Sequence, residues 1–261
     1  MQHTMIEALG RARLAAKSIP EFAAGERPKG EAEGYEVQAG LAEWFRGKGL
    51  GKVAGYKVGA TTAAMQQYLG VEMPAYGRIM EANVYASGAR IDASRFYKPG
   101  IECEVAVRIG ADIPLRDAEW TREELSGHIA AIAPAIELVE NRYGDFLAAG
   151  FGTLIADDFF HKACVAGDFI EDWHATDLPR VSGRTVIDGA EVATGDGAQV
   201  MGHPLETLVW LANKLRSQGR SLKAGEIVLT GSMTPVIWLE TFPAEIEIEI
   251  AGLGGCSVVL S

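Results

Sequence analysis

Alternation of apolar and polar positions predicts a β-strand between Pro99 and Ile109. Ile101, Cys103, Val105, Val107 and Ile109 alternate there with Glu102, Glu104, Ala106 and Arg108, the period of a pleated strand with one buried face. Isoleucines and glutamates alternate in the same way over 244–250. Shorter strands are expected at 55–59, 226–230 and 257–260, and an Asp-Gly turn predicts a hairpin over 184–193.

Other segments carry apolar residues at the helical period. Thr121 and Glu124 form a capping box that predicts a further helix, with Leu125, Ile129 and Ile132 on its inner face. Many short strands with a few helices predict an α+β fold around a curved, mixed β-roll or barrel. The remaining helices are expected at 4–17, 34–48, 62–69 and 204–219, with His203 as a turn or capping residue before the last.

Carboxylates on the predicted strands suggest a metal site. Glu102 and Glu104 would point the same way, with β-carbons roughly 7 Å apart. Such carboxylates are preferred ligands of hard divalent cations, although an edge strand with a charged solvent face would look the same. Glu137 interrupts a second apolar run, where a lone carboxylate is costly unless a cation or proton compensates it. A half-exposed strand position is the alternative for Glu137.

Six short motifs follow one another along the chain: Gly55-Tyr56-Lys57-Val58-Gly59, Gln66-Gln67-Tyr68-Leu69-Gly70-Val71, Ile101-Glu102-Cys103-Glu104, Pro134-Ala135-Ile136-Glu137, Gly202-His203-Pro204-Leu205 and Leu229-Thr230-Gly231. With them, the sequence from about residue 35 to the C-terminus resembles the 2-keto-4-pentenoate (2-hydroxypenta-2,4-dienoate) hydratase and 4-oxalocrotonate decarboxylase family of the fumarylacetoacetase-like superfamily. The resemblance implies a β-rich catalytic core with an N-terminal helical part, and a homo-oligomer. It assigns Glu102, Glu104 and Glu137 to a divalent metal, Mg²⁺ or Mn²⁺.

Length and composition narrow the class of protein. The 261 residues, 48% of them apolar, allow a small helical region at 1–52 and a β-rich catalytic domain at 53–261. A formal net charge of −11 disfavours a nucleic-acid partner, and no apolar run has the length of a membrane-spanning helix. Three cysteines without a Cys-x-x-Cys spacing, and an N-terminus unlike a signal peptide, predict a cytoplasmic protein.

Two cationic residues are candidates for contact with a small 2-oxo acid substrate. Lys57 lies between Tyr56 and Val58 in a short strand that we expect to be buried, and its motif match gives it a place in the family's active site. We expect Lys57 to bind the substrate and to transfer a proton; a surface lysine paired with a carboxylate is the alternative. Arg142 matches a family arginine, which could bind the substrate's carboxylate or form a structural salt bridge.

Two positions depart from the family pattern. Ala82 stands where the hydratases carry a catalytic aspartate, and the neighbouring Glu81 could replace it, although on a strand it would face the other side. Phe160 replaces a family serine that would touch substrate. Asp157, Asp158 and His161 could form an alternative acid–base group, or a solvated turn beside two aromatic core residues.

These residues predict a metal-dependent hydratase that adds water to a 2-hydroxydienoate or 2-oxoalkenoate in the degradation of aromatic compounds. Decarboxylation of a 2-oxo-enedioate and C–C hydrolysis of an acylpyruvate are alternatives, because all three reactions need enolate stabilisation by the metal. A non-catalytic or structural subunit that binds metal and ligand and partners an active homologue is a third hypothesis, and a complex with a pathway neighbour is a separate one. Ala82 and Phe160 favour the non-catalytic subunit; retention of Lys57 and the three glutamates opposes it.

Overall fold

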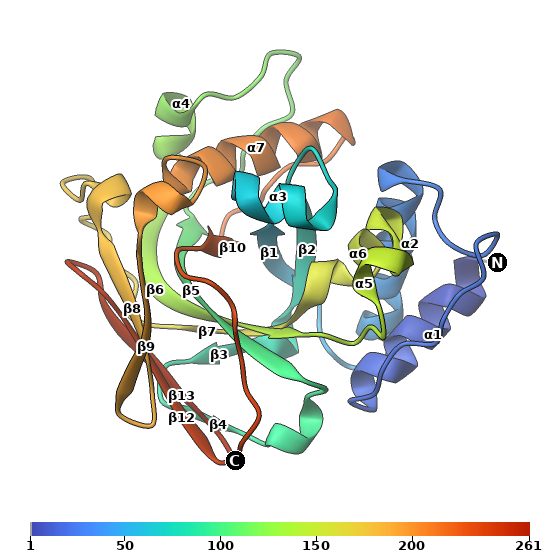
Figure 1. Ribbon diagram of the computed structural model, residues 1–261. Helices are drawn as coiled ribbons and strands as arrows, with labels where there is room; N and C mark the ends of the chain where they lie inside the picture. Colours follow the sequence, from blue (N-terminus) through green and yellow to red (C-terminus); the bar gives the residue numbers. More distant parts are fainter. Residues whose placement is uncertain (1) are drawn as a thin grey trace.

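Two mixed β-sheets form the centre of the computed structural model, which describes residues 2–261 (Figure 1). The larger sheet has the order β2 (Ala75–Met80), β1 (Val53–Gly59), β10 (Ile227–Ser232), β5 (Pro99–Ile109), β6 (Ile129–Glu140), β7 (His161–Ala166) and β3 (Val84–Ala86), with β11 (Ile237–Trp238) paired to β5. The smaller sheet has the order β4 (Ala89–Ile91), β13 (Gly254–Leu260), β12 (Ala244–Ile250), β8 (Ser182–Ile187) and β9 (Ala190–Asp196).

The larger sheet curls into an open roll. Its end strands β2 and β3 are not hydrogen-bonded to each other, so the roll does not close into a barrel within residues 2–261. The smaller sheet packs across β6 and β7 through β12 and β13. This arrangement confirms the expected α+β fold with a β-roll core and N-terminal helices.

The helices lie around the larger sheet (Figure 1). They are α1 (Gln2–Leu14), α2 (Glu31–Gly47), α3 (Ala63–Leu69), α4 (Arg122–Ser126), α5 (Phe146–Ala149), α6 (Phe151–Ala156) and α7 (Pro204–Ser217), with short 3₁₀ turns that include η1 (Glu81–Asn83) and η3 (Asp158–Phe160). The first two helices pack on each other, α2 also packs against α6 and β2, and α7 crosses the sheet against β10. Among residues 2–261 no helix has both the length and the apolar character needed to cross a membrane.

Several local predictions are confirmed. Strand β12 alternates strictly between buried isoleucines and exposed glutamates. The hairpin of β8 and β9 turns at Asp188 and Gly189, with φ values of 51° and 78°, as an Asp-Gly turn requires. His203 is the N-cap of α7, where its Nδ1 accepts a hydrogen bond from the backbone N–H of Leu205.

The helix expected after Thr121 is much shorter than its apolar pattern suggested. The capping box of Thr121 and Glu124 is present, but α4 ends at Ser126. Ile129 and Ile132 lie instead on strand β6, where Ile129 pairs with Ile109 of β5. Leu125, Ile129 and Ile132 are spaced four and three residues apart, which fits a helical stripe. However, Gly127 follows the helix, and the apolar segment after it pairs with β5.

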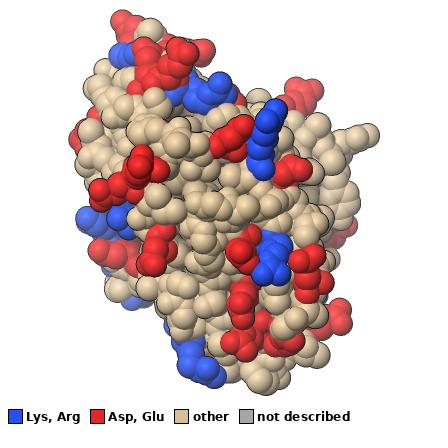
Figure 2. All heavy atoms as spheres, turned by 90° about the vertical axis from the view of Figure 1, so that its left-hand side faces the viewer, with Lys and Arg blue, Asp and Glu red and all other residues tan. Residues whose placement is uncertain are grey.

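The outer face of the smaller sheet carries both signs of charge. Figure 2, which views the left-hand side of Figure 1, shows basic side chains interspersed with acidic ones. Arg184 on this sheet, for example, donates to Glu249 on the next strand, and both side chains are about half exposed. On the face drawn in Figure 2, therefore, acidic side chains interrupt any basic path that a phosphate backbone could follow.

Candidate metal and catalytic site

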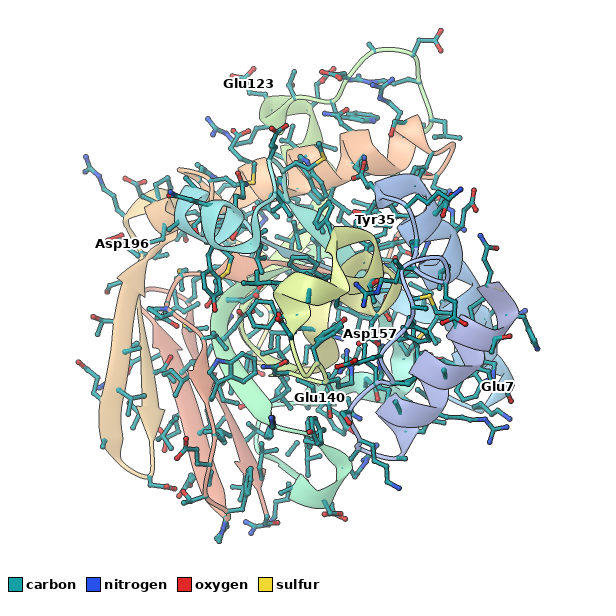
Figure 3. All side chains as sticks on the ribbon, turned by 45° about the vertical axis from the view of Figure 1, so that its right-hand side comes forward. Glu7, Tyr35, Glu123, Glu140, Asp157 and Asp196 are labelled. Carbon is teal, nitrogen blue, oxygen red and sulfur yellow. The ribbon has the colours of Figure 1, made fainter. Side chains whose placement is uncertain are left out.

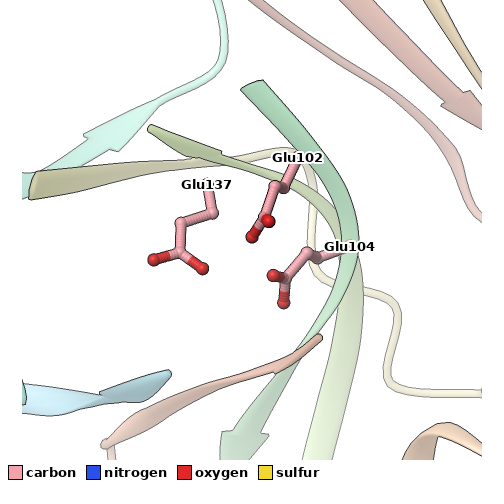
Figure 4. A group of neighbouring side chains, drawn as sticks. All are labelled: Glu102, Glu104 and Glu137. Carbon is pink, nitrogen blue, oxygen red and sulfur yellow. The ribbon is translucent and has the colours of Figure 1, made fainter. Parts of the chain in front are cut away.

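Three glutamates converge where β5 and β6 pair. Glu102 and Glu104 lie two residues apart on one face of β5, and Glu102 pairs directly with Glu137 of β6. Each of the three offers a carboxylate oxygen, and these oxygens lie within 4.8 Å of one another (Figure 4). The antiparallel register thus brings together side chains that are 33 residues apart in sequence, Glu104 to Glu137.

Because the cluster is buried, charging its three carboxylates together is energetically costly. Glu104 and Glu137 are fully buried, and Glu104 Oε1 and Glu137 Oε2 have no hydrogen-bond partner. Burial and then the charge of Glu137 raise the pKa of Glu102 to about 7, and burial and the neighbouring carboxylates raise that of Glu104 well above its usual range. A divalent cation would remove this mutual repulsion. Clustered, unpaired carboxylate oxygens are the donor set that hard cations prefer, so the cluster could hold one.

Lys57 and His161 both contact Glu137. Lys57 Nζ, on β1, lies 3.2 Å from Glu137 Oε1, and His161 Nδ1, at the start of β7, lies 2.8 Å from the same oxygen. Burial alone would raise the pKa of Glu137, but Lys57 and His161 lower it to about 2. Burial lowers the pKa of His161 despite Glu137. Because the Glu137 carboxylate accepts, His161 donates to it through Nδ1, and the buried Nε2 of His161 has no partner. Lys57 is 2% exposed, which confirms the expected buried strand.

A cavity of about 150 Å³ opens beside the cluster. Lys57 and Glu102 lie at its polar end. The ring of Phe159 packs 5.4 Å from Lys57 Nζ, and a side chain at Gly59 would collide with that ring, so glycine is needed there. Most of the lining is apolar, and the remaining lining residues are Ala60, Met65, Tyr68, Leu69, Val139, Asn141, Phe146, Phe160, Val236 and Trp238.

A second group of charged side chains is fully buried, and two of its members, Glu140 and Asp157, are labelled in Figure 3. Arg142 donates from Nε to Asp157 Oδ2 over 2.7 Å and from Nη1 to Glu140 Oε2 over 2.5 Å. Arg13 of α1 donates from Nη2 to Asp157 Oδ1 over 2.7 Å and from Nη1 to Asp158 Oδ2 over 2.8 Å. Burial disfavours the Asp157 carboxylate, but Arg142 and Arg13 outweigh it and lower its pKa. These five residues, which we term the arginine network, join the N-terminal helix to the segment that precedes β7.

The arginine network supports a strained turn. Asp158, Phe159 and Phe160 have φ values of 54°, 49° and 69°, a region that costs non-glycine residues of order 1 kcal/mol or more each. Asp158 is fixed by Arg13 and by the backbone N–H of Arg78, which donates to Asp158 Oδ1 over 2.9 Å. The turn places Phe159 and Phe160 in the cavity wall and His161 against Glu137.

The structure brings most of the candidate residues to one region, but only some of them line the cavity or contact the glutamates. Lys57 and Phe160 line the cavity, and His161 contacts Glu137. Asp157 and Arg142 lie in the arginine network and not in the cavity lining. Glu81 is not brought into the cluster: it begins the turn η1, and its side chain is exposed.

Several residues of the site were not anticipated from sequence. Arg13 lies on the apolar stripe of α1, and a charged residue in such a stripe is a signal from which a buried charge could have been predicted. Glu140 follows Glu137 on the same strand. Phe159, Phe146 and Trp238 carry no sequence signal that separates a cavity wall from ordinary core.

Comparison with known proteins defines the class. Residues 57–260 match the family model described as fumarylacetoacetate (FAA) hydrolase C-terminal. This match covers most of the chain, so the chain belongs to that family.

Particular relatives are named as hydratases and as a decarboxylase. The chain is 31% identical over 213 residues to 2-hydroxyhexa-2,4-dienoate hydratase of Comamonas testosteroni, covering 79% of this chain and 78% of the relative. It is 30% identical over 204 residues to 2-keto-4-pentenoate hydratase of Paraburkholderia xenovorans, covering 78% and 74%. Its structure superposes on 4-oxalocrotonate decarboxylase from Pseudomonas putida G7, complexed with calcium and acetate, with a TM-score of 0.89 and 26% identity, covering 100% of this chain and 97% of the other. The same decarboxylase has a structure complexed with magnesium and adipate.

Proposed function

We propose that this chain is a divalent-metal-dependent hydratase, a hydro-lyase that adds water to a 2-hydroxydienoate or 2-oxoalkenoate in the breakdown of aromatic compounds. One observation carries the proposal: three carboxylates converge on one point, and one of them, Glu102, lines an otherwise apolar cavity together with Lys57. The hydratase relatives, at 30% and 31% identity, support the reaction class.

In this proposal Glu102, Glu104 and Glu137 hold Mg²⁺ or Mn²⁺. Their oxygens fit a hard cation, and the unpartnered oxygens of Glu104 and Glu137 are available to it. When bound, the cation supplies Lewis-acid stabilisation of the enolate of a 2-oxo acid. The carboxylate and keto oxygens of that acid, together with water, suit the coordination positions that three protein ligands leave open.

Lys57 is the residue that we propose for proton transfer. Hydration of a dienol requires loss of its hydroxyl proton, gain of a proton at the far end of the diene, and then addition of water to the remaining double bond. Lys57 Nζ lies at the cavity surface beside the carboxylates, where it can hold or deliver these protons. His161 acts on Glu137 and serves as a positioning residue. Glu81 has no place in this scheme because its side chain is exposed.

Decarboxylation of a 2-oxo-enedioate is the second candidate. The observation that favours it is the superposition of the whole chain on a decarboxylase, with a TM-score of 0.89. Because both reactions pass through a dienolate, the carboxylates and Lys57 would serve either one.

Two substrates separate these candidates. The purified protein is incubated with 2-hydroxypenta-2,4-dienoate and with 2-oxohex-3-enedioate, each with Mg²⁺ or with EDTA, while dienol absorbance and CO₂ release are followed. Metal-dependent loss of the dienol without CO₂ supports the hydratase, whereas CO₂ release from the enedioate supports the decarboxylase. Absence of turnover on both acids would refute both and leave a binding subunit.

We also propose a cytoplasmic homo-oligomer, acting beside a neighbouring enzyme of its pathway. The family resemblance supports the assembly, and the free thiols of Cys103, Cys164 and Cys256 suit a reducing compartment. Light scattering on the purified chain tests the assembly: a monomer at micromolar concentration would contradict it.

A further inference from the structure

The end of the cavity away from the glutamates has a consistent chemistry. Phe159 and Phe160 contact edge to face with centroids 5.7 Å apart, and Phe160 contacts Phe146 in the same way, also at 5.7 Å. Tyr68 of α3 packs on Phe146 at 5.8 Å, so aromatic side chains from three segments form a continuous wall. Trp238, 44% exposed, lies at the opening.

Charge in this cavity is confined to its polar end. Lys57 is the single cation among the lining residues, and it is already paired with Glu137. Three carboxylates, Lys57 and a bound dication sum to zero, so the carboxylate of a chelating 2-oxo acid brings the whole to −1. Of the other lining residues, Asn141 and Tyr68 carry polar side chains, and both are neutral.

A second carboxylate on the substrate would therefore lie in the aromatic part of the cavity without a counter-ion. An isolated charge transferred from water into such surroundings is strongly disfavoured. A hydrocarbon tail gains by the same transfer, at about 0.8 kcal/mol per buried methylene. The whole cavity, polar end included, has a volume of about 150 Å³, comparable to a cavity that one benzene molecule fills, so a 2-oxo acid head group leaves room for a short tail.

From these observations we propose that the substrate has one carboxylate, held at the glutamate end, and a short uncharged hydrocarbon tail, held by Phe146, Phe159 and Phe160. This inference rests on the proposed function and narrows it. It selects 2-oxo and 2-hydroxydienoic monoacids over enedioates.

Binding of paired 2-oxo acids tests the proposal without turnover. 2-Oxohexanoate and 2-oxoadipate differ in whether the chain ends in a methyl group or a carboxylate, and calorimetry with the Mg²⁺-loaded protein measures both. We expect the monoacid to bind at least about tenfold more tightly, and 2-oxo-4-phenylbutanoate, whose tail is too large for the cavity, to bind more weakly than 2-oxohexanoate. Equal or tighter binding of 2-oxoadipate would overturn the tail assignment alone. Failure of every 2-oxo acid to bind would overturn the proposed function and the tail assignment together.

A charge inserted at the opening gives an independent test. Trp238→Arg places a cation in the lining, and we expect it to reduce the preference for the monoacid by about tenfold or more. Val192→Arg is the matched control, because Val192 is 47% exposed on the edge strand β9 and lies outside the lining. An unchanged preference in Trp238→Arg, with a thermal unfolding midpoint like that of the control, would show that the tail lies elsewhere.

Discussion

Substitution of Arg13 by Gln should destabilise the whole protein, although Arg13 lies on the first helix and far from the glutamates in sequence. Arg13 is 2% exposed and donates to both Asp157 and Asp158, which are 0% and 1% exposed. Removing one partner from a buried ion pair leaves a charge without compensation, at a cost of about 3–5 kcal/mol. Arg142 still contacts Asp157, so the lower part of this range is expected.

The thermal unfolding midpoint measures this loss. For a chain of this size, about 3–5 kcal/mol corresponds to a fall of roughly 6–20 °C. Arg11→Gln is the matched control: two residues earlier on the same helix, Arg11 is 72% exposed and pairs with Glu7 in solvent, where such pairs contribute little. If the two variants shift the midpoint equally, the arginine network does not stabilise the fold as argued.

Three further predictions concern the candidate site and its charges. Arg142 and Arg13 hold the pKa of Asp157 below its ordinary 3.8 despite burial, so the stabilisation is complete above about pH 5 and is lost as the pH falls below about 4. The unfolding midpoint should fall over that range, and a midpoint that rises with acid would contradict the assignment. Glu104→Gln should abolish the increase in unfolding midpoint that Mg²⁺ gives the wild type, and an unchanged increase would exclude Glu104 as a ligand. Lys57→Met should lower kcat by about 10²-fold or more while Mg²⁺ binding, measured by calorimetry, persists; wild-type kcat would exclude Lys57 from proton transfer.

Local patterns predicted much of this fold because they report on single elements. The strict alternation at 99–109 places Glu102 and Glu104 on one face, and the structure has them there. The Asp-Gly hairpin and the capping role of His203 follow equally from local chemistry. The prediction that Leu125, Ile129 and Ile132 share one helix was wrong. The same spacing occurs on the stripe of a helix and at the start of a strand, and here pairing with β5 determines that Ile129 and Ile132 lie on a strand.

Contacts between distant segments could not be predicted in this way. Glu137 comes opposite Glu102 through the register of two long strands, which no local period specifies. The contacts of Arg13 with Asp157 and Asp158 span 144 and 145 residues. Asp157 was therefore interpreted as a possible acid–base group, whereas in the structure it accepts hydrogen bonds from two guanidinium groups.

Strand β6 explains how the first helices reach the glutamate cluster. Glu137 and Glu140 are three residues apart and so face opposite sides of the strand, one toward Lys57 and His161, the other toward Arg142. The segment from Asp157 to His161 connects the arginine network to the glutamate cluster, because it contacts Arg13 and Arg142 at one end and Glu137 at the other.

We therefore expect residues 53–261 alone not to behave as an autonomous domain. Deleting residues 1–52 removes Arg13 from two buried carboxylates, and it removes Gln38, whose side chain accepts from Arg78 and donates to the backbone oxygens of Tyr76 and Ile155. Several buried polar groups would lose their partners at once, each at a cost of about 1–3 kcal/mol, which together approaches the whole stability of a typical domain. The shortened chain should lose cooperative thermal unfolding and fixed near-ultraviolet circular dichroism. Cooperative unfolding with a midpoint that Mg²⁺ still raises would show instead that the β-roll stands without its helices, and that the strained turn at 158–160 is held by the roll itself.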